Sequence, residues 1–253
     1  PYRRQRQMCI RDRGMTDSKC ETFGMRKLTN QNALLQINNR RLFLRGTLEC
    51  CIFPLKGYPP MDEANWEKVF SAARDYGMNH LRFHSWCPPE AAFNVADRMG
   101  FYIQVELPLW TLNVGEDKST VDFLYNEAAH IMKEYGNHPS FCFWSLGNEL
   151  QGDFSVMDKL LTTIKQQDSR HLYMTTTFTF EPGHGSWPEP NDDFWVTQWT
   201  KNGWVRGQGI FDDQPVSFNK DFSSAIEGLP VPLITHEIGQ YSVCLLYTSP
   251  SPR

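Results

Sequence analysis

The sequence lacks several features that would place it in common functional classes. No run of apolar residues approaches the about 18 that a membrane-spanning helix needs, so we expect no membrane span. No glycine-rich phosphate-binding loop follows the first predicted strand, where Gly46–Cys50 holds a single glycine. The sequence also lacks the low hydrophobicity of disordered chains, because 40% of its residues are hydrophobic. The net charge is only −4, which disfavours nucleic acid as a partner.

Cysteine spacing excludes two further classes. The seven cysteines include no Cys-x-x-Cys pair and have no regular spacing. This pattern fits neither a disulfide framework nor a structural zinc site. We therefore expect free thiols, and no metal or cofactor is predicted.

The two ends of the chain differ from the rest. Residues Pro1–Arg13 carry five arginines without apolar periodicity, and residues 244–253 form a Ser/Pro-rich tail. Both segments resemble conceptual translations of sequencing-adaptor DNA, and we predict that both are non-native. A natural basic arm and a natural tail are the alternative. Segments of this kind are excluded from fold reasoning.

Between these ends, strand-like and helix-like patterns alternate. Asn38-Asn39 lies between two β-type runs and predicts a hairpin turn. Helices are predicted to begin after Asp62, at Pro88–Glu90, at Ser119 and at Met157, with a short helix over Phe222–Ile226. Seven strands are predicted over Arg41–Thr47, Asn79–His84, Phe101–Leu107, Phe141–Leu146, His171–Thr177, Phe194–Trp199 and Val231–His236.

This alternation predicts an α/β fold with a parallel sheet. A (β/α)8 TIM barrel fits best, with the chain truncated before the eighth strand. A doubly wound open sheet is the alternative, but it usually carries the missing phosphate loop. An unclosed barrel would leave two bare strand edges, so we expect the chain as written to be poorly soluble and weakly active.

In a barrel, catalytic groups lie at the C-terminal ends of the strands. Carboxylates, amides and aromatic rings dominate those positions in this chain, which is typical of a site for a neutral polyol. Two acids on different strands that share one cleft suit glycoside hydrolysis, one as proton donor and the other as an ionised nucleophile. The strand-end positions are Glu49, Arg82, His84, Trp86, Glu106, Trp110, Trp144, Asn148, Glu149, Gln198, Trp199, His236 and Glu237.

Five segments together resemble one enzyme family. Ser145–Glu149 resembles the Asn-Glu motif on the fourth strand of clan A glycoside hydrolases. Asn38–Gly46 resembles the opening of the catalytic barrel in glycoside hydrolase family 2. Leu233–Gly239 resembles the seventh strand of that barrel, which carries the nucleophile. Asn79–His84 and Val105–Pro108 fit that family's second and third strands. The resemblance covers essentially residues 22 to 243.

The resemblance implies a role for each matching residue. Glu149 would be the general acid/base and Glu237 the nucleophile. Asn148 would bond the sugar 2-hydroxyl, and Arg82 would keep Glu237 ionised. Polar subsite groups would be His84 and Glu106, while Trp144, Trp110 and Trp199 would stack on a sugar face. His236 would point out of the barrel, because neighbours on a strand face opposite ways.

The resemblance also implies an overall assignment. The protein would be a retaining β-glycosidase acting on terminal β-galactosides or β-glucuronides, of a divergent gut-bacterial branch, with a periplasmic or secreted location favoured. Residues 14–40 would be the end of a β-sandwich domain and its linker, and residues 41–243 the incomplete barrel. The oligomeric state is left open. Two alternatives are a non-catalytic carbohydrate-binding protein on the same barrel and a metal-dependent barrel hydrolase, for which His84 and Glu106 are too few ligands.

Overall fold

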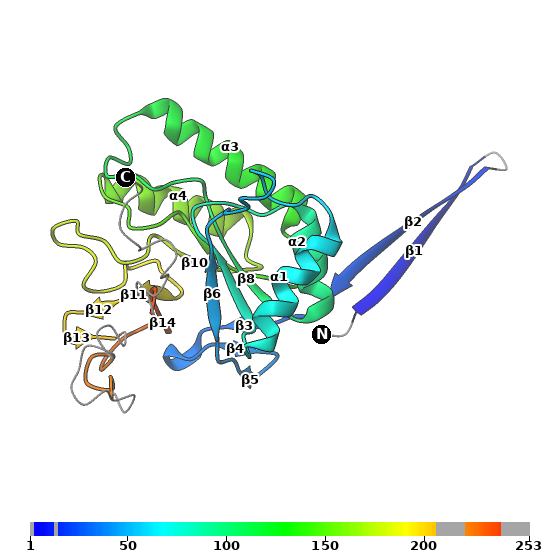
Figure 1. The fold of residues 1–253 in the computed structure, drawn as a ribbon. Helices are drawn as coiled ribbons and strands as arrows, with labels where there is room; N and C mark the ends of the chain where they lie inside the picture. Colours follow the sequence, from blue (N-terminus) through cyan, green and yellow to red (C-terminus); the bar gives the residue numbers. More distant parts are fainter. Residues whose placement is uncertain (1–2, 13–14, 206–220, 239–253) are drawn as a thin grey trace, which may run out of the picture.

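The computed structural model describes residues 3–12, 15–205 and 221–238. Within these ranges, side chains are described for Ser18 and from residue 23 onward. The centre of the structure is a five-stranded parallel sheet in the order β10-β9-β8-β7-β6 (Figure 1). Two neighbouring parallel strands need a crossover connection that brings the chain back to the end of the sheet where the first strand began. In this protein a helix provides each of these connections. The strands are β6 (Gly46–Glu49), β7 (His80–Phe83), β8 (Tyr102–Glu106), β9 (Phe141–Ser145) and β10 (Leu172–Met174).

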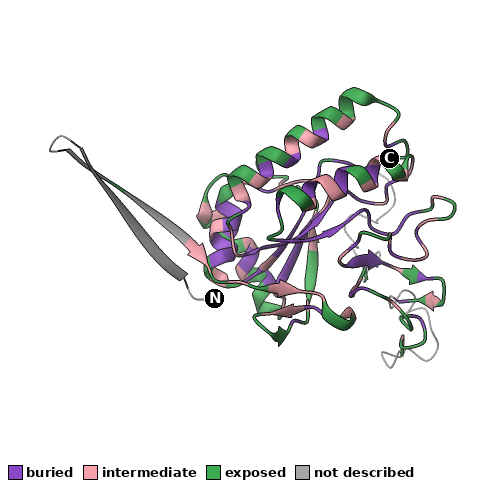
Figure 2. Cartoon of the chain, turned by 180° about the vertical axis from the view of Figure 1, so that it is seen from behind, coloured by how far each residue is buried: buried purple, intermediate pink, exposed green. Residues whose placement is uncertain are grey.

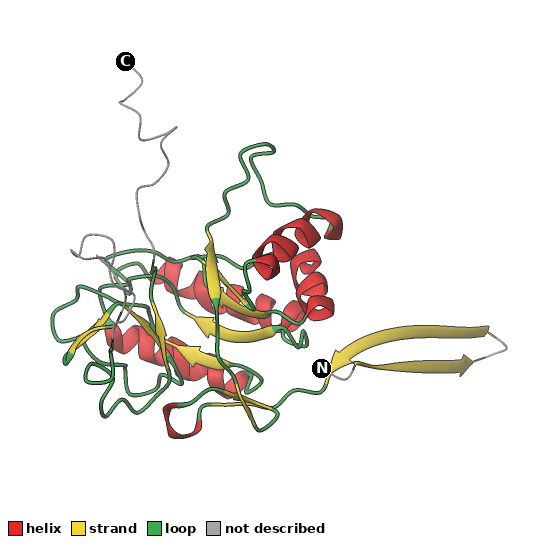
Figure 3. Ribbon diagram, turned by 60° about the horizontal axis from the view of Figure 1, so that its bottom comes forward, coloured by secondary structure: helices red, strands yellow, loops and turns green. Residues whose placement is uncertain are grey.

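Four helices connect these strands and lie against one face of the sheet (Figure 3). Strands β7 to β10 and the facing sides of the helices are buried, whereas β6 and the outer sides of the helices are more exposed (Figure 2). Aspartate side chains at Asp62, Asp117 and Asp153 accept backbone N–H groups and fix three helix starts. The helices are α1 (Glu63–Asp75), α2 (Glu90–Met99), α3 (Lys118–Tyr135) and α4 (Phe154–Gln167).

A second parallel pair continues the barrel beyond β10. β11 (Trp195–Thr197) pairs with β14 (Leu233–Thr235). The backbone N–H of Phe178 donates to Val196 O at 2.9 Å, which ties the end of β10 to β11. The α/β barrel prediction is therefore confirmed in its seven strands. Within the described residues no strand bridges β14 and β6.

Side-chain alternation along the strands separates two cores. On β8, Ile103 and Val105 join the aromatic-rich cluster between sheet and helices, which includes Trp66 and Phe93. The intervening residues point into the barrel, because successive side chains on a strand face opposite ways. The barrel interior holds a smaller apolar cluster: Leu35, Leu42, Cys142, Phe143, Leu172, Met174, Phe194, Trp195, Val196 and Val231.

A small antiparallel sheet covers one end of the barrel. It consists of β3 (Leu28–Thr29), β4 (Gln36–Ile37) and β5 (Arg40–Arg41), with the short 3-10 turn η1 (Gln31–Ala33) between β3 and β4. Arg26 donates to Pro139 O at 3.1 Å and to Arg170 O at 2.7 Å, just before β9 and β10 begin. The small sheet therefore lies at the N-terminal ends of the barrel strands and leaves the C-terminal ends open.

The structure describes the N-terminal segment of the chain but not the last residues. β1 (Arg3–Asp12) and β2 (Met15–Gly24) form an antiparallel hairpin that projects away from the barrel (Figure 1). The predicted non-native segment 244–253 lies outside the described residues. The origin of both ends and the domain boundaries stay predictions. None of the helices in the described ranges is long and apolar enough to cross a membrane.

Two element predictions need correction. The first barrel strand is Gly46–Glu49 rather than Arg41–Thr47, because Leu42 pairs its backbone with Leu35 at 2.8 Å and covers the barrel end instead. The predicted helix at Phe222–Ile226 is a series of turns. By contrast, the hairpin at Asn38-Asn39 is confirmed: both residues have positive φ, 50° and 63°, as a type I′ turn requires.

Asp192 makes the stability of this fold sensitive to pH. Its buried carboxyl group accepts from Thr175 N at 2.6 Å, Thr175 Oγ1 at 2.8 Å and Glu189 N at 3.0 Å. Burial nevertheless raises its pKa to about 7. The folded protein then holds a proton that the unfolded chain releases above about pH 4. Unfolding free energy should therefore fall as pH rises from about 4 to 7, by up to about 1.4 kcal/mol per unit.

Urea unfolding midpoints across that range test this prediction. Asp192→Asn should flatten the slope and lower the stability throughout, because the amide nitrogen cannot accept from Glu189 N. Asp122→Asn on the exposed side of α3 is the matched control and should keep the slope. An unchanged slope in Asp192→Asn would contradict the assignment.

Candidate functional site

A buried ion pair organises the open end of the barrel. Arg82 on β7 contacts Glu106 at the end of β8, with Nε 2.6 Å from Oε1. Arg82 Nη2 also donates to Asn148 Oδ1 at 2.5 Å, just after β9. These side chains are 4%, 0% and 1% exposed, so the three strand ends are joined in a nearly dry environment. Arg82 Nη1 is buried as well, and no described residue accepts a hydrogen bond from it.

Glu106 lies buried beneath the open end of the barrel, and its role as a subsite group stays a prediction. Its carboxylate accepts from Ser85 N at 2.7 Å and from Gln104 Nε2 at 3.2 Å, in addition to Arg82. The carboxylate is fully buried, and these three partners fix its orientation. Its negative charge compensates the desolvated guanidinium of Arg82.

Two threonine hydroxyls fasten the turn that carries Asn148 and Glu149. Thr177 Oγ1 accepts from Glu149 N at 2.8 Å and donates to Asn148 Oδ1 at 3.0 Å. Thr176 Oγ1 accepts from Leu150 N at 2.9 Å. Sequence reasoning missed these residues, although the run Thr175–Thr177 at a strand end was a visible signal. Oδ1 of Asn148 therefore accepts two hydrogen bonds, and no described residue accepts a hydrogen bond from its Nδ2.

Gly147 allows this turn to approach the neighbouring loop. A Cβ at this position would lie 2.2 Å from Leu109 O. Any larger residue would therefore force this turn and the backbone at Leu109 apart.

The two carboxylates at the ends of β9 and β14 share an unusual backbone. Glu149 and Glu237 both have φ of 49°, in the left-handed region that non-glycine residues rarely adopt. Such conformations are costly and cluster at functional sites, where the surrounding contacts maintain them. At Glu149 the threonine contacts supply that support.

Glu237 lies among positively polarised groups. Its Oε1 is 3.1 Å from His236 Nε2 and 4.0 Å from His84 Nε2. The hydrogen bond with His236 lowers the pKa of Glu237 to about 2, with Arg82 and His84 contributing and partial burial opposing. The carboxylate is therefore ionised over the whole neutral range.

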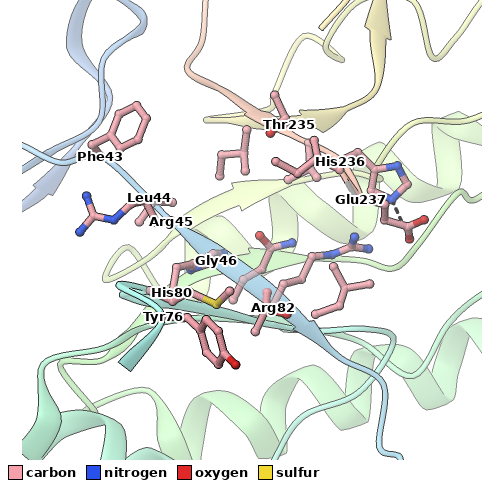
Figure 4. A pocket seen from close by; sticks show the side chains of 17 residues that line it. Phe43, Leu44, Arg45, Gly46, Tyr76, His80, Arg82, Thr235, His236 and Glu237 are labelled. Atoms are coloured by element: carbon pink, nitrogen blue, oxygen red, sulfur yellow. Dashed lines mark ion pairs between the residues drawn. The ribbon is translucent and has the colours of Figure 1, made fainter. Parts of the chain in front are cut away.

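His236 does not point out of the barrel as the strand alternation predicted. β14 ends at Thr235, and the left-handed backbone at Glu237 brings both side chains to the same side (Figure 4). His236 is 1% exposed, so a buried imidazole and a part-exposed carboxylate form one pair.

Of the other predicted site residues, some lie at the open end of the barrel and one is buried in the core. His84, whose pKa is lowered mainly by burial, touches the exposed ring of Trp110 edge-on at a centroid distance of 5.0 Å. Trp199 is 38% exposed after β11. Trp144 is 1% exposed and stacks on Tyr173 at 5.9 Å, on the helix side of the sheet. The structure therefore corrects the prediction that Trp144 contacts sugar, because it is a core residue.

A cavity of about 610 Å³ opens between β6 and β14 (Figure 4). It reaches Arg82, His236 and Glu237 from the side of the barrel. Its other walls belong to Phe43 and Tyr76 near the opposite end, so it is an opening into the barrel interior rather than a cleft over the strand ends. In the described parts of the chain, no cluster of three or more His, Cys, Asp or Glu side chains could hold a metal ion.

Comparison with known proteins adds relatives to this geometry. Among curated proteins, the chain is 26% identical to β-galactosidase 2 of Enterobacter cloacae over 151 residues, which is 57% of this chain and 14% of that protein. It is 29% identical to the β-galactosidase of Oenococcus oeni over 152 residues, which is 58% of this chain and 14% of that protein. The chain thus spans a small part of these relatives.

Solved structures show the same fold. A β-glucuronidase from Ruminococcus gnavus in complex with D-glucaro 1,5-lactone superposes with a TM-score of 0.72 at 19% identity, over 92% of this chain and 41% of that chain. The β-glucuronidase of Parabacteroides merdae superposes with a TM-score of 0.66 at 21% identity, over 83% of this chain and 26% of that chain.

The family model described as "Glycosyl hydrolases family 2, TIM barrel domain" matches residues 28–181. That range contains the small sheet, β6 to β10 and all four helices, together with Arg82, Asn148 and Glu149. The match covers more than half of the chain, and the predicted family is confirmed: the chain belongs to glycosyl hydrolase family 2, and residues 28–181 match its TIM-barrel domain.

Proposed function

We propose that this protein is a retaining β-glycosidase that hydrolyses terminal β-galactosides or β-glucuronides. One observation carries the proposal. Glu237 is held ionised beside His236, while Glu149 extends from a strained turn that Asn148 and Arg82 connect to the same network. An ionised carboxylate and a second carboxyl group on another strand are the pair that double displacement requires.

In this mechanism Glu237 attacks the anomeric carbon while Glu149 donates a proton to the leaving oxygen. A glycosyl ester on Glu237 results. Glu149, now ionised, then removes a proton from water, and the attack of that water releases the sugar with its original anomeric configuration. The low pKa of Glu237 suits both a nucleophile and a leaving group.

Residues next to the two glutamates would stabilise the oxocarbenium-like transition state. The Nδ2 donor of Asn148, which no described residue engages, would bond the sugar 2-hydroxyl. Arg82 fixes that amide by occupying its oxygen and places positive charge near Glu237. Because Asn148 is clamped before substrate binds, its hydrogen bond needs little reorganisation in the transition state.

Azide rescue distinguishes the two glutamates. With nitrophenyl β-galactopyranoside or β-glucuronide, Glu237→Gly should lose turnover by several orders of magnitude. Added azide should restore activity and give an α-glycosyl azide, because azide replaces the nucleophile in one inversion. Glu149→Ala with azide should give the β-glycosyl azide, because the ester on Glu237 still forms with a good leaving group.

Glu134→Gln, on the exposed side of α3, is the control and should behave as wild type. The same azide anomer from both variants would refute the roles. A wild-type protein that binds sugars without cleaving any of these glycosides would favour the carbohydrate-binding alternative.

The pH profile of kcat/KM tests the pairing of His236 with Glu237. The ascending limb follows ionisation of the nucleophile in the free enzyme. Removing the His236 hydrogen bond raises the pKa of Glu237, so His236→Phe should move that limb upward by about one pH unit. His130→Phe on the exposed surface of α3 should leave the limb in place. An unmoved limb in His236→Phe would show that the pair does not tune the nucleophile.

A further inference from the structure

Beyond β10 and β11, three large aromatic side chains lie on the surface next to each other. Phe180, Trp199 and Trp204 are 71%, 38% and 56% exposed, and we refer to them as the aromatic platform. Trp199 and Trp204 lie directly opposite each other in an antiparallel pair, β12 (Trp199–Thr200) and β13 (Gly203–Trp204) (Figure 1). Their ring centroids are 6.3 Å apart with an interplanar angle of 39°.

A buried ring supports the platform from below. Phe178 is 3% exposed and contacts Phe180 at 4.7 Å and Trp199 at 6.1 Å. Phe178 follows Thr177, whose hydroxyl holds the backbone N–H of Glu149. An unbroken series of contacts therefore leads from the turn of the acid/base glutamate to the platform.

Backbone contacts place the platform at the same barrel end as Glu237. β11 ends at Thr197, whose carbonyl accepts from His236 N at 2.8 Å. Thr197 Oγ1 then donates to Trp199 O at 2.9 Å. The platform thus begins where β11 and β14 end, and Phe178 connects it with the Glu149 side of the site.

Hydrogen bonds from the surrounding chain hold the β12–β13 pair of the platform in place. Thr200 Oγ1 donates to Ala225 O at 2.5 Å, and Val205 N donates to Gln198 O at 3.0 Å. Lys201 N donates to Ser186 O at 2.8 Å, while its ammonium group lies 3.8 Å from the ring centre of Trp187. A preformed aromatic surface loses little side-chain entropy on binding, and exposed apolar patches of this kind mark binding sites.

We propose that the aromatic platform binds the leaving-group part of the substrate, as further sugar units of a β-linked oligosaccharide. The inference depends on the proposed function, because only then does the leaving group depart on the side of Glu149. A pyranose ring has an apolar C–H face and a polar rim. Its C–H face matches an exposed tryptophan ring, and its rim matches nearby polar side chains such as the half-buried Gln198 and the exposed Asn202.

A substrate comparison tests the platform. Nitrophenyl β-galactopyranoside and β-glucuronide identify the terminal sugar that the enzyme accepts, and a β-linked tetrasaccharide with that terminal sugar is the second substrate. In Trp204→Ala, the kcat/KM for the tetrasaccharide relative to that for the nitrophenyl glycoside should fall about tenfold. Trp204→Phe keeps an aromatic ring and should recover most of the loss in this ratio. A purely structural role of the indole would not predict that recovery.

Phe180→Ala gives an independent reading, since Phe180 is the most exposed member and lies outside the β12–β13 pair. It should lower the same ratio. Tyr76→Ala, an 84% exposed ring beyond the end of α1, is the matched control and should leave the ratio unchanged.

The outcomes separate the two proposals. If nitrophenyl glycosides are cleaved and the ratio is unchanged in Trp204→Ala and Phe180→Ala, the platform inference is overturned while the proposed function stands. If the wild-type protein cleaves neither nitrophenyl glycosides nor the tetrasaccharides, the proposed function fails and the platform inference with it.

Discussion

The buried ion pair between Arg82 and Glu106 is the interaction on which the open end of the barrel depends. Taking a guanidinium out of water is costly, and only a close, well-bonded carboxylate offsets that cost. Glu106 meets this requirement with Arg82 at 2.6 Å and with Ser85 N at 2.7 Å. Because Arg82 also bonds Asn148, the pair sets the relative positions of the ends of β7, β8 and β9.

The environments of the two candidate catalytic glutamates follow from this constraint. Arg82 lends positive charge to the surroundings of Glu237, and its hold on Asn148 fixes the residue directly before Glu149. Both glutamates have left-handed backbones at the ends of their strands. The β-sheet core is rigid enough to maintain these two strained residues, which is how a common barrel scaffold can support a specific site.

The sequence predicted the alternating architecture well, since periodicity and helix capping are local properties. Asp62 begins α1 as expected, and six of the seven strands lie where their apolar runs indicated. It did not predict which face a strand-end residue takes. Glu106 and Trp144 were both expected in the cleft, yet one is enclosed in the barrel and the other packs under the helices. A one-residue difference reverses the face, and no local pattern fixes it.

The site needed contacts that are distant in sequence. His236 pairs with Glu237 because the backbone leaves the strand at Thr235, a turn that strand alternation cannot foresee. Thr177 joins Asn148 across 29 residues. Family resemblance predicted roles for the two glutamates, whereas the structure adds the groups that hold the turn of Glu149 and keep Glu237 ionised.

The central claim is that Glu237 forms a covalent bond to the sugar. A 2-deoxy-2-fluoro glycoside with a good leaving group slows hydrolysis of the glycosyl-enzyme, and peptide mapping by mass spectrometry then locates the label. The account predicts one sugar per protein molecule, attached to Glu237. A label on any other residue, or turnover with inverted configuration and no label, would contradict it.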